Sequence, residues 1–595
     1  MQRPHCCLVY LSWDHTTRVD RYATKKRLKD VTGAPLYVST CTTTIDFSHK
    51  PRNMPFAGDD AVAVLGLMAA FKGAIDGYLL IESFFDKDNK SWDLAVEYHI
   101  QKLLLENWRD FQNINAPDWK NCRLSNANTK DQKIVLHILA RITTLNKEAE
   151  RFIKKHLDTN LLADFTSESG QSGASGPESL NSAAVNNFAS QQMQAKQKGR
   201  MSWSIKDKAK FNEIVQQLRH YNRDLTDLFS RRDAQLFDSV LPSQMLAGLN
   251  DEEAIKKLRE QESDRVLLRH AASLKLMQQG LSRVPAAQII QEEEITPRLS
   301  GIGQSRKSLG VRNFKNIWIE WRLISNQMSD SQRSLVRDRQ HNLSGILSSV
   351  TDASLRIPQH EGVIEVDEIS GSDTQTWIGF VNAVPRDCTA KVPESLYHII
   401  AACAEPPLGE KFRLVAELAK SLSIFHSASW LHKAFRSDNV IFFEGEAVEA
   451  IQYPSITNPF ITGFGVARPD LGVSIETKPT GKGAFDHYYH PGAQNGATKA
   501  FDWYSFGIIM LEIAHWKLVP VMIEEQNIAA ELRQDLAGIQ KICQDSVEFL
   551  PAITGSRFSK VVGICLGAKL AAVDDGEMAR LVATEIVQVL ERLWA

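Results

Sequence analysis

The densest group of chemically capable side chains lies in one short polar loop, residues 432–439. It places an imidazole, two cations, a carboxylate and an amide close together, in His432, Lys433, Arg436, Asp438 and Asn439. A carboxylate such as Asp438 can act as a general base, and the amide oxygen of Asn439 can bind a hard cation. Asparagine side chains also stabilise loops by bonding the backbone, and we prefer that interpretation for Asn439.

The residues around the loop predict the elements that must hold it. The stretch that begins at Ile424 is predicted to open with a helix, and the polar loop follows it. Two strands separated by an insertion come next, and a second loop opens with Gly463-Phe464-Gly465.

This order of elements resembles the C-terminal lobe of protein kinases, where a loop H-R-D-L-K-P-x-N is followed by D-F-G. His432 and Asn439 stand seven residues apart, as in the family pattern. Ala434 stands at the catalytic Asp position, Arg436 at the loop lysine, and Gly463 at the D of D-F-G. The resemblance implies an ATP pocket beside Asn439, Phe464 and Gly465, with Arg322 as a further contact.

The departures from the pattern remove the groups that do the chemistry. Kinases use one Asp to accept the substrate proton and a second to hold magnesium. The methyl group of Ala434 cannot accept a proton, and Gly463 has no side-chain oxygen for a metal. Asp438 corresponds to the variable residue before Asn439, which makes it a weak substitute base. We therefore expect the degenerate loop to contain no catalytic residue, and the chain not to act as an enzyme.

The kinase resemblance is weaker upstream of the loop. The strand-like segment Ile317–Arg322 resembles the strand that ends in V-A-I-K, with Arg322 replacing the lysine. Arg322 keeps the charge but is larger and forked. The fragment Gly301–Arg306 is only a partial glycine-rich loop and is better explained as linker. No Glu occurs between Ser329 and Asp352, so the usual Lys–Glu pair cannot form from that segment. The strand Trp377–Val381 would lead into the hinge between two lobes.

Downstream, the resemblance is more specific. Tyr488–Gly492 stands where kinases have Y-x-A-P-E, and Lys499–Glu512 resembles the buried helix that opens D-x-Y-S-F-G. The resemblance implies that Asp502 bonds the loop backbone in a scaffold role. His487 and His490 have no carboxylate or cysteine at metal-ligand spacing, so no metal site is expected.

Length and composition exclude several classes of protein. A chain of 595 residues is too long for one core, and 43% hydrophobic with 24% charged residues is ordinary for a globular protein. The net charge of −2 argues against nucleic-acid binding. The eight cysteines form no C-x-x-C pair, as expected in a reducing compartment. No apolar run reaches the length of a membrane span.

The N-terminal third carries helical periodicity instead. Residues 1–56 show no sustained pattern and are an extension of uncertain origin. Apolar residues then recur at helical spacing in four segments, and residues 166–200 are Ser, Gly, Asn and Gln rich, as in a flexible loop. The four predicted helices are residues 61–85, 93–111, 130–157 and 203–229, the first capped by Asp59 or Asp60.

These segments resemble the fungal HeLo domain, the helical bundle of HET-s-type prion-inhibition and propagation proteins. The likeness rests on Phe71–Tyr78 with Phe84-Phe85, on Leu103–Trp108, and on Trp203–Phe211. In that family the first apolar helix can enter a membrane. Here Lys72 and Asp76 interrupt it, and a buried bundle helix explains the same pattern equally well.

The expected fold is multidomain: a HeLo-like all-α bundle at 57–240, a helical linker or solvated brace at 241–299, and an α+β bilobal protein-kinase-like domain at 300–595. We expect a cytoplasmic cell-death or signalling protein in which a pseudokinase regulates the bundle. Its expected partners are further copies of itself, a membrane on activation, and a protein activator, with no nucleic acid. The alternatives are a divergent active kinase that uses ATP and an interaction scaffold; ATP is the only cofactor considered and no metal is expected.

Overall fold

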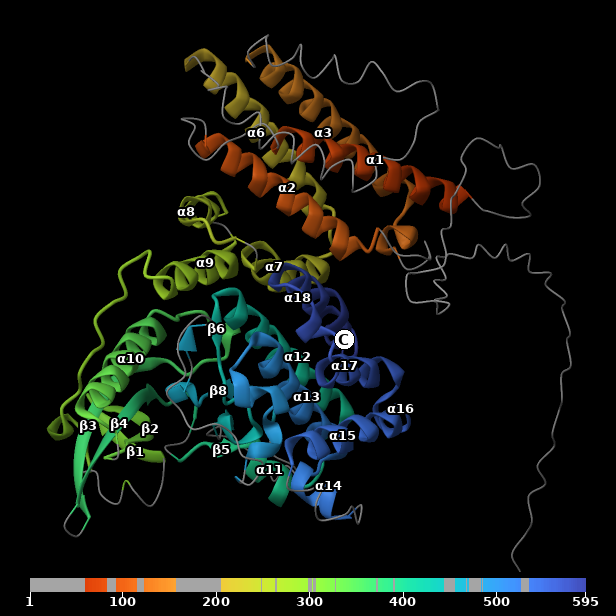
Figure 1. Ribbon diagram of the computed structural model, residues 1–595. Coiled ribbons are helices and arrows are strands. Elements are labelled where there is room, and N and C mark those ends of the chain that lie inside the picture. The colour runs from red at the N-terminus through yellow and green to blue at the C-terminus, as the bar shows by residue number, and fades with distance from the viewer. Residues whose placement is uncertain are drawn as a thin grey trace, which may run out of the picture. The chain divides into compact units, whose positions relative to one another are not determined.

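The polypeptide is represented by a computed structural model, drawn in Figure 1. It describes residues 59–82, 92–114, 122–156, 205–297, 302 and 307–594, with gaps at 248, 263–264, 327, 371–372, 389–390, 444–454, 467, 470–482, 484 and 526–534. The described residues belong to one compact unit, Gly58–Ala595. The predicted extension, the 166–200 loop and most of the Gly301–Arg306 fragment lie outside the described residues.

Four long helices form the N-terminal bundle: α1 (Asp59–Glu82), α2 (Trp92–Gln112), α3 (Thr129–His156) and α6 (Ile205–Asp227). The four helices predicted from periodicity are therefore present. Their apolar faces share one core, which includes Leu67, Tyr78, Trp108, Leu139 and Phe211. Figure 1 shows α1, α2, α3 and α6 lying side by side.

A polar residue lies inside this bundle core. Asn146 of α3 is 1% exposed, donates to the carbonyl of Ala74 at 2.8 Å and accepts from the Tyr98 hydroxyl at 2.7 Å. It therefore joins α1, α2 and α3, because a buried amide is stable only when hydrogen-bonded. A Cβ at Gly77 would lie 2.7 Å from the Cβ of Asn146, so glycine lets α1 pass close to α3.

Three shorter helices follow: α7 (Arg231–Leu246), α8 (Glu252–Gln261) and α9 (Val266–Gln278). Asp251 caps α8 by accepting from the backbone N–H of Ala254. The expectation of a solvated connector is wrong for α9, whose apolar residues Leu268, Ala271, Ala272 and Leu276 are fully buried. Even Lys275 of this helix is buried, and its ammonium donates to the carbonyl of Leu246.

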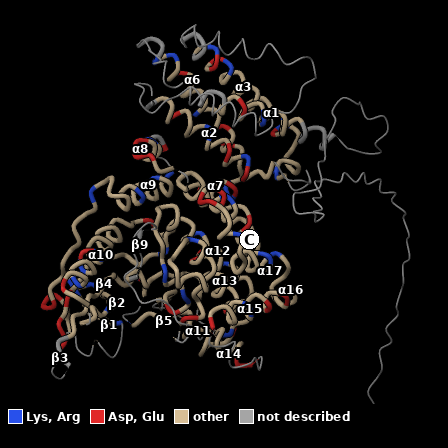
Figure 2. The backbone as a smooth tube through the Cα atoms, viewed as in Figure 1, with Lys and Arg blue, Asp and Glu red and all other residues tan. Residues whose placement is uncertain are grey.

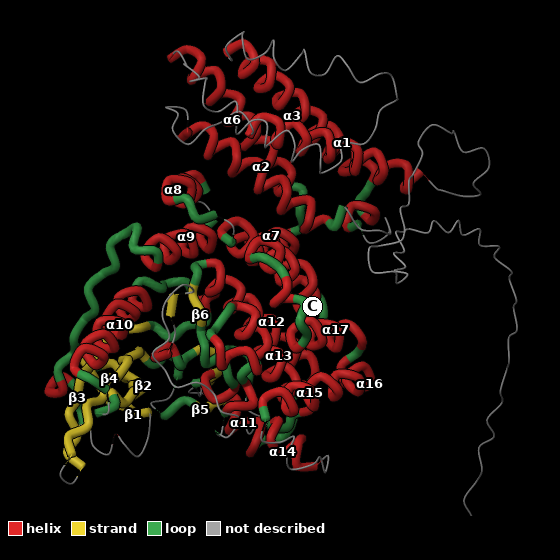
Figure 3. Tube along the Cα trace, viewed as in Figure 1, coloured by secondary structure: helices red, strands yellow, loops and turns green. Residues whose placement is uncertain are grey.

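The next segment builds a four-stranded antiparallel sheet of order β1-β2-β4-β3. Its strands are β1 (Lys307–Arg312), β2 (Lys315–Ile324), β3 (His360–Ser370) and β4 (Asp373–Ala383). Helix α10 (Asp330–Ser348) comes between β2 and β3 and packs against β3. Figure 3 shows that the strands belong to the C-terminal region and that the elements before them are helical.

The remainder is mainly helical, with two small antiparallel sheets, β5-β7-β8 and β6-β9. The strands are β5 (Glu394–Ser395), β6 (Trp430–Leu431), β7 (Val440–Phe442), β8 (Phe460–Ile461) and β9 (Arg468–Pro469). The helices are α11 (Leu396–Ala402), α12 (Leu408–Ser427), α13 (Lys499–His515), α14 (Val519–Glu525), α15 (Leu536–Ser546), α16 (Leu550–Thr554), α17 (Ser556–Leu566), α18 (Asp575–Leu581) and α19 (Gln588–Glu591). A π-helical turn, Val582–Val587, joins α18 to α19.

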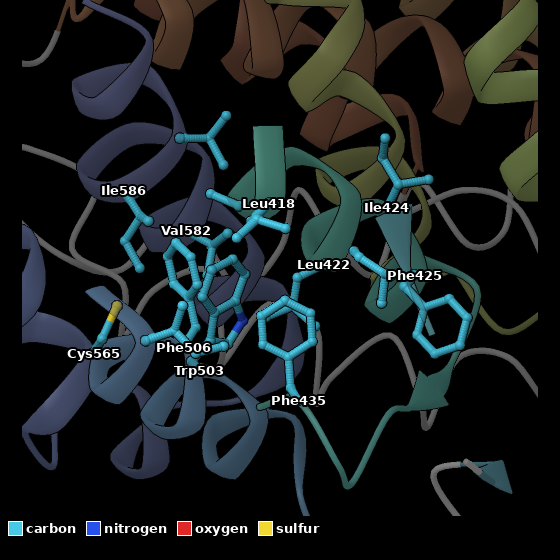
Figure 4. Close-up of a cluster of buried hydrophobic side chains, with 14 of the residues drawn as sticks. Leu418, Leu422, Ile424, Phe425, Phe435, Trp503, Phe506, Cys565, Val582 and Ile586 are labelled. Atoms are coloured by element: carbon cyan, nitrogen blue, oxygen red, sulfur yellow. The ribbon is translucent and has the colours of Figure 1, made fainter. Parts of the chain in front are cut away.

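The core of this region forms where α12 and α13 meet the C-terminal helix, the continuous run of α18, the π turn and α19 (residues 575–591). Figure 4 shows Leu418 and Leu422 of α12, Trp503 and Phe506 of α13, and Val582 of the π turn in one cluster. α13 is buried along almost its whole length, as the predicted central helix should be. Among the described helices none is alone both long and apolar enough to cross a membrane, whereas the pair α13 and α14 meets those criteria together across a 66° bend.

Charge is distributed without a dominant sign. Figure 2 shows basic and acidic positions interspersed along the elements of the bundle and of the C-terminal region. This pattern agrees with the near-neutral net charge of −2.

Candidate functional site

The loop 432–439 is held by one buried carboxylate at the start of α13. Asp502 accepts from the backbone N–H groups of His432, at 2.7 Å, and of Lys433, at 2.9 Å, and from Nε2 of His426 at 3.0 Å. Burial alone would raise the pKa of this carboxyl, but these bonds and the neighbouring imidazoles lower it below its ordinary value. The predicted scaffold role of Asp502 is confirmed.

His432 is a structural residue. Its ring is 1% exposed, and its Nε2 donates to the carbonyl of Thr462 at 2.9 Å. Burial lowers the pKa of His432 to about 4, so the imidazole is neutral near pH 7. Phe464 packs against it, with ring centroids 5.0 Å apart. His432 therefore ties the first loop to the second.

The positions where kinases carry their two aspartates contain no acceptor side chain. Ala434 is buried, and its carbonyl accepts from Nδ2 of Asn439 at 2.8 Å. Asn439 thus stabilises the loop through the backbone, as preferred from its residue type. Gly463 has φ +83°, and a Cβ there would lie 2.3 Å from Nδ2 of Asn439. Asn439 therefore fills the space that a side chain at 463 would need.

The side chains on one face of β2 lie between the four-stranded sheet and these loops. Successive side chains of a strand point to opposite faces, so Trp318, Glu320 and Arg322 share the face opposite Ile319 and Trp321, which pack in an apolar core on the sheet's other side. Glu320 accepts from the N–H of Gly463 at 3.2 Å.

Arg322 and Glu320 contact different residues of the second loop. Arg322 lies beside Gly465, where an added Cβ would be 3.3 Å from its Cδ. Burial raises the pKa of the Glu320 carboxyl, although the bond from Gly463 lowers it in part. From α10, Gln340 donates to the carbonyl of Gly465 at 3.0 Å. Gln340 therefore ties α10 to the loop that opens at Gly463.

Trp318 fills the neighbouring space. It is fully buried and packs with Val384 and Ile441, with Leu309 and Phe460 at the edge of the cluster. Its indole lies edge-on to Phe443, at 6.4 Å between centroids. Its Nε1 has no hydrogen-bond partner among the described residues. The bulky side chain thus bridges the sheet and β7.

The loop cation is engaged within its own loop. Nε of Arg436 lies 2.9 Å from Oδ1 of Asp438, and its Nη2 donates to Oδ2 at 3.0 Å. The guanidinium also lies 4.5 Å from the ring of Phe485. Asp438 is therefore an ion-pair partner of Arg436, which is a poor arrangement for a general base.

A second buried polar chain runs beneath the loop. The hydroxyls of Ser437 and Tyr488 lie 2.5 Å apart, and that of Tyr488 donates to Oε2 of Glu512 at 2.7 Å. The N–H of Val519 donates to the other carboxyl oxygen of Glu512 at 3.2 Å. Burial raises the pKa of Glu512 to about 7. This chain links the loop to α13 and α14.

The structure thus brings together Arg322, Asn439, Phe464 and Gly465, the residues predicted to surround a pocket. Sequence reasoning missed Trp318, Glu320 and Gln340. The alternation of β2 was the available signal, because it places a carboxylate and an indole on the same face as Arg322. His487 and His490 serve packing: burial lowers the pKa of His487 to about 4, and His490 stacks on Phe501 at 4.4 Å. No group of three or more metal-ligating side chains occurs in the described part of the chain.

Two family models match parts of the sequence. Residues 61–258 match HeLo, described as prion-inhibition and propagation, and residues 383–594 match a domain of unknown function, DUF7580. No curated protein matches the chain. The N-terminal helical region is thus similar to the HeLo family, and the helical C-terminal region to a family without an assigned activity.

Proposed function

We propose that this chain is a fungal signalling protein of the cell-death or incompatibility type, in which the HeLo region is the effector. The C-terminal region is a catalytically inactive, protein-kinase-like regulator of that effector. Activation releases the HeLo region to associate with further copies of itself and with a membrane.

The order of elements supports the kinase-like part of the proposal. A four-stranded antiparallel sheet with one helix between its second and third strands precedes a mainly helical half. The loop 432–439 follows α12, and the helix α13 supplies Asp502 to its backbone. These are the positions that the kinase motifs assign to the catalytic loop and to the helix beneath it.

The chemistry of the site supports inactivity. Transfer of a phosphoryl group requires a base and bound magnesium at defined positions. Ala434 and Gly463 provide neither, and Asp438 is paired with Arg436. Trp318 and Glu320 occupy the space beside Ile441 and Gly463 where a nucleotide would have to lie.

The observation that carries regulation is the position of α7. This helix lies inside the HeLo match, residues 61–258, yet its apolar side chains share a core with α12 and the C-terminal helix. The two regions therefore cannot separate without exposing apolar surface, which gives the C-terminal region a physical means of restraining the HeLo region.

The test compares the full chain with residues 59–229, which contain the separate core of α1, α2, α3 and α6. We expect the fragment to be toxic or membrane-associated in cells and the full chain to be quiet. A fragment that stays monomeric and harmless would remove the basis for an effector.

A thermal-shift titration of the full chain with ATP and magnesium tests inactivity. A ligand at a hundred times its dissociation constant adds about 2.7 kcal/mol to stability. We expect no shift. A shift accompanied by phosphate transfer, lost when the pocket is blocked, would instead establish a divergent kinase.

A further inference from the structure

We propose that α7 is a release joint: through this helix the C-terminal region binds the HeLo region in the resting chain and releases it on activation. The joint comprises α7, α12 and residues 575–591. This inference rests on the proposed function and assigns its regulation to particular contacts.

Helix α7 is buried on two sides. Toward the bundle, the ring of Phe237 lies 5.3 Å from that of Phe111 in α2, and Met245 accepts from Nδ2 of Asn107 at 3.0 Å. Away from the bundle, Ser243 faces α12 across a small cavity. Val240 and Leu241 are fully buried. A helix enclosed on both sides transmits a displacement of one neighbour to the other, because packed interiors have few voids.

Polar contacts close the rim of the joint. Arg123, in the connection between α2 and α3, lies 3.7 Å above the ring of Phe111 and pairs with Asp233 of α7 at 2.8 Å. Its second nitrogen donates to Oε1 of Gln588 at 2.9 Å. Burial lowers the pKa of Arg123 to about 10, so its charge is held in a poorly solvated place. The contacts with Asp233 and Gln588 offset part of this burial cost and hold the guanidinium between α7 and the C-terminal helix.

A second rim contact lies alongside. Arg232 of α7 donates to the carbonyl of Glu591 at 3.3 Å. The carboxylate of Glu591 pairs with Lys420 of α12 at 2.8 Å. The C-terminal helix is thus tied both to α7 and to α12.

The interior of the joint is imperfectly packed. A cavity of about 20 Å³ lies between α7, α12, α13 and α18, which otherwise pack on one another. Two polar atoms of its lining residues, Oγ of Ser423 and Nδ1 of His426, are buried without a hydrogen-bond partner in the described chain. The cavity has room for about one water-sized group beside these two atoms. α7 also contains Pro242, which lacks the N–H that a helix interior uses. The side of α7 that faces α12 is therefore packed less tightly than its bundle side.

The joint is one side chain away from the degenerate loop. His426 lines the cavity, and its Nε2 bonds Asp502, which holds the backbone of His432 and Lys433. A shift of the loop backbone would move Asp502, and Asp502 would move His426. Because His426 belongs to α12, the shift would reach the side of α12 that faces α7. This connection gives a signal at the former catalytic loop a direct route to the HeLo region.

The experiment uses the full chain and measures hydrogen exchange of the α7 amides. Arg232→Ala combined with Gln588→Ala removes two rim hydrogen bonds to the C-terminal helix, the one from Arg232 to Glu591 and the one from Arg123 to Gln588. Ser423→Val fills the cavity and removes an unpartnered hydroxyl. Lys569→Ala is the matched control, because it breaks an ion pair with Glu585 in the same C-terminal segment without touching α7. We expect exchange about tenfold faster in the rim variant, slower in Ser423→Val, and unchanged in the control.

An unchanged rate of α7 amide exchange in the rim variant, or a faster rate in Ser423→Val, would contradict the proposal that α7 is a release joint. Leakage from phosphatidylcholine–phosphatidylserine vesicles is measured on the same proteins, and we expect it to rise only in the rim variant. Faster α7 exchange without leakage would support the joint and count against the proposed function.

Discussion

The side chain of Asn439 occupies the space that a side chain at position 463 would need. A Cβ at 463 would lie 2.3 Å from Nδ2 of Asn439, and Gly463 itself has φ +83°. The backbone shape at 463 and the placement of Asn439 therefore leave no room for an aspartate at this position.

The first prediction follows from this relationship. Gly463→Asp, alone or with Ala434→Asp, should not create a kinase and should lower the free energy of unfolding by about 2 kcal/mol or more, because left-handed backbone and close contact both penalise a side chain. Urea unfolding and a phosphotransfer assay measure the two effects. A stable double variant that transfers phosphate would contradict the proposed degeneration.

The second prediction concerns Asp502. Asp502→Asn weakens three hydrogen bonds to a buried charge and should cost about 2–3 kcal/mol. The pKa of Asp502 is lowered from 3.8, so its contribution is present above that pH and is lost as the pH falls through the lower folded value. The variant should therefore lose part of the acid dependence of unfolding. Asp438→Asn is the control; its pair with Arg436 is partly exposed, and we expect a change under about 1 kcal/mol.

The third prediction concerns Glu512, whose titration has the opposite sign. Its pKa is raised from 4.5 to about 7, so its stabilising contribution is full below about pH 4.5 and is lost as the pH rises towards 7. Glu512→Gln mimics the protonated form. We expect the variant to gain on the wild type by up to about 3 kcal/mol between pH 4.5 and pH 8, measured by urea unfolding.

Glu585 provides the matched control for Glu512. Lys569 and Lys560 outweigh its partial burial and lower its pKa. Glu585→Gln should therefore change stability in the opposite direction with pH. Equal pH profiles for the two variants would refute the assignment to Glu512.

The fourth prediction compares two glycines of α1. Gly77→Ala places a Cβ 2.7 Å from that of Asn146 and should destabilise the bundle by about 1–3 kcal/mol. Gly66→Ala meets nothing within 4 Å and should stabilise α1 by about 1 kcal/mol through helix propensity. Thermal unfolding measures both. A stabilising Gly77→Ala would show that Asn146 moves aside easily.

Much of the fold could be predicted because its signals are local. The apolar spacing of residues such as Phe71, Trp108 and Phe211 depends on helical periodicity alone, and the bundle helices were located within a few residues. Asp502 and His432 could be assigned because a family motif fixes their relation.

The remaining features depend on contacts between distant residues. Arg123 and Gln588 are 465 positions apart, and nothing near either one indicates the other. Trp318 and Glu320 could be placed on one face of a strand, but what that face meets depends on Ile441 and Gly463. α9 was expected to be solvated because its segment carries a charged helical pattern, and its burial follows from packing that periodicity does not specify.

The enclosure of α7 has a consequence for how such genes can recombine. A crossover placed at the end of the HeLo match would pair this helix with a foreign α12 and C-terminal helix. The hybrid would lack the α12 and C-terminal helix against which α7 packs in this chain, and its α7 would be left without a matching surface on that side. Lineages that shuffle these halves should therefore exchange that surface together with the helix, and the two should covary.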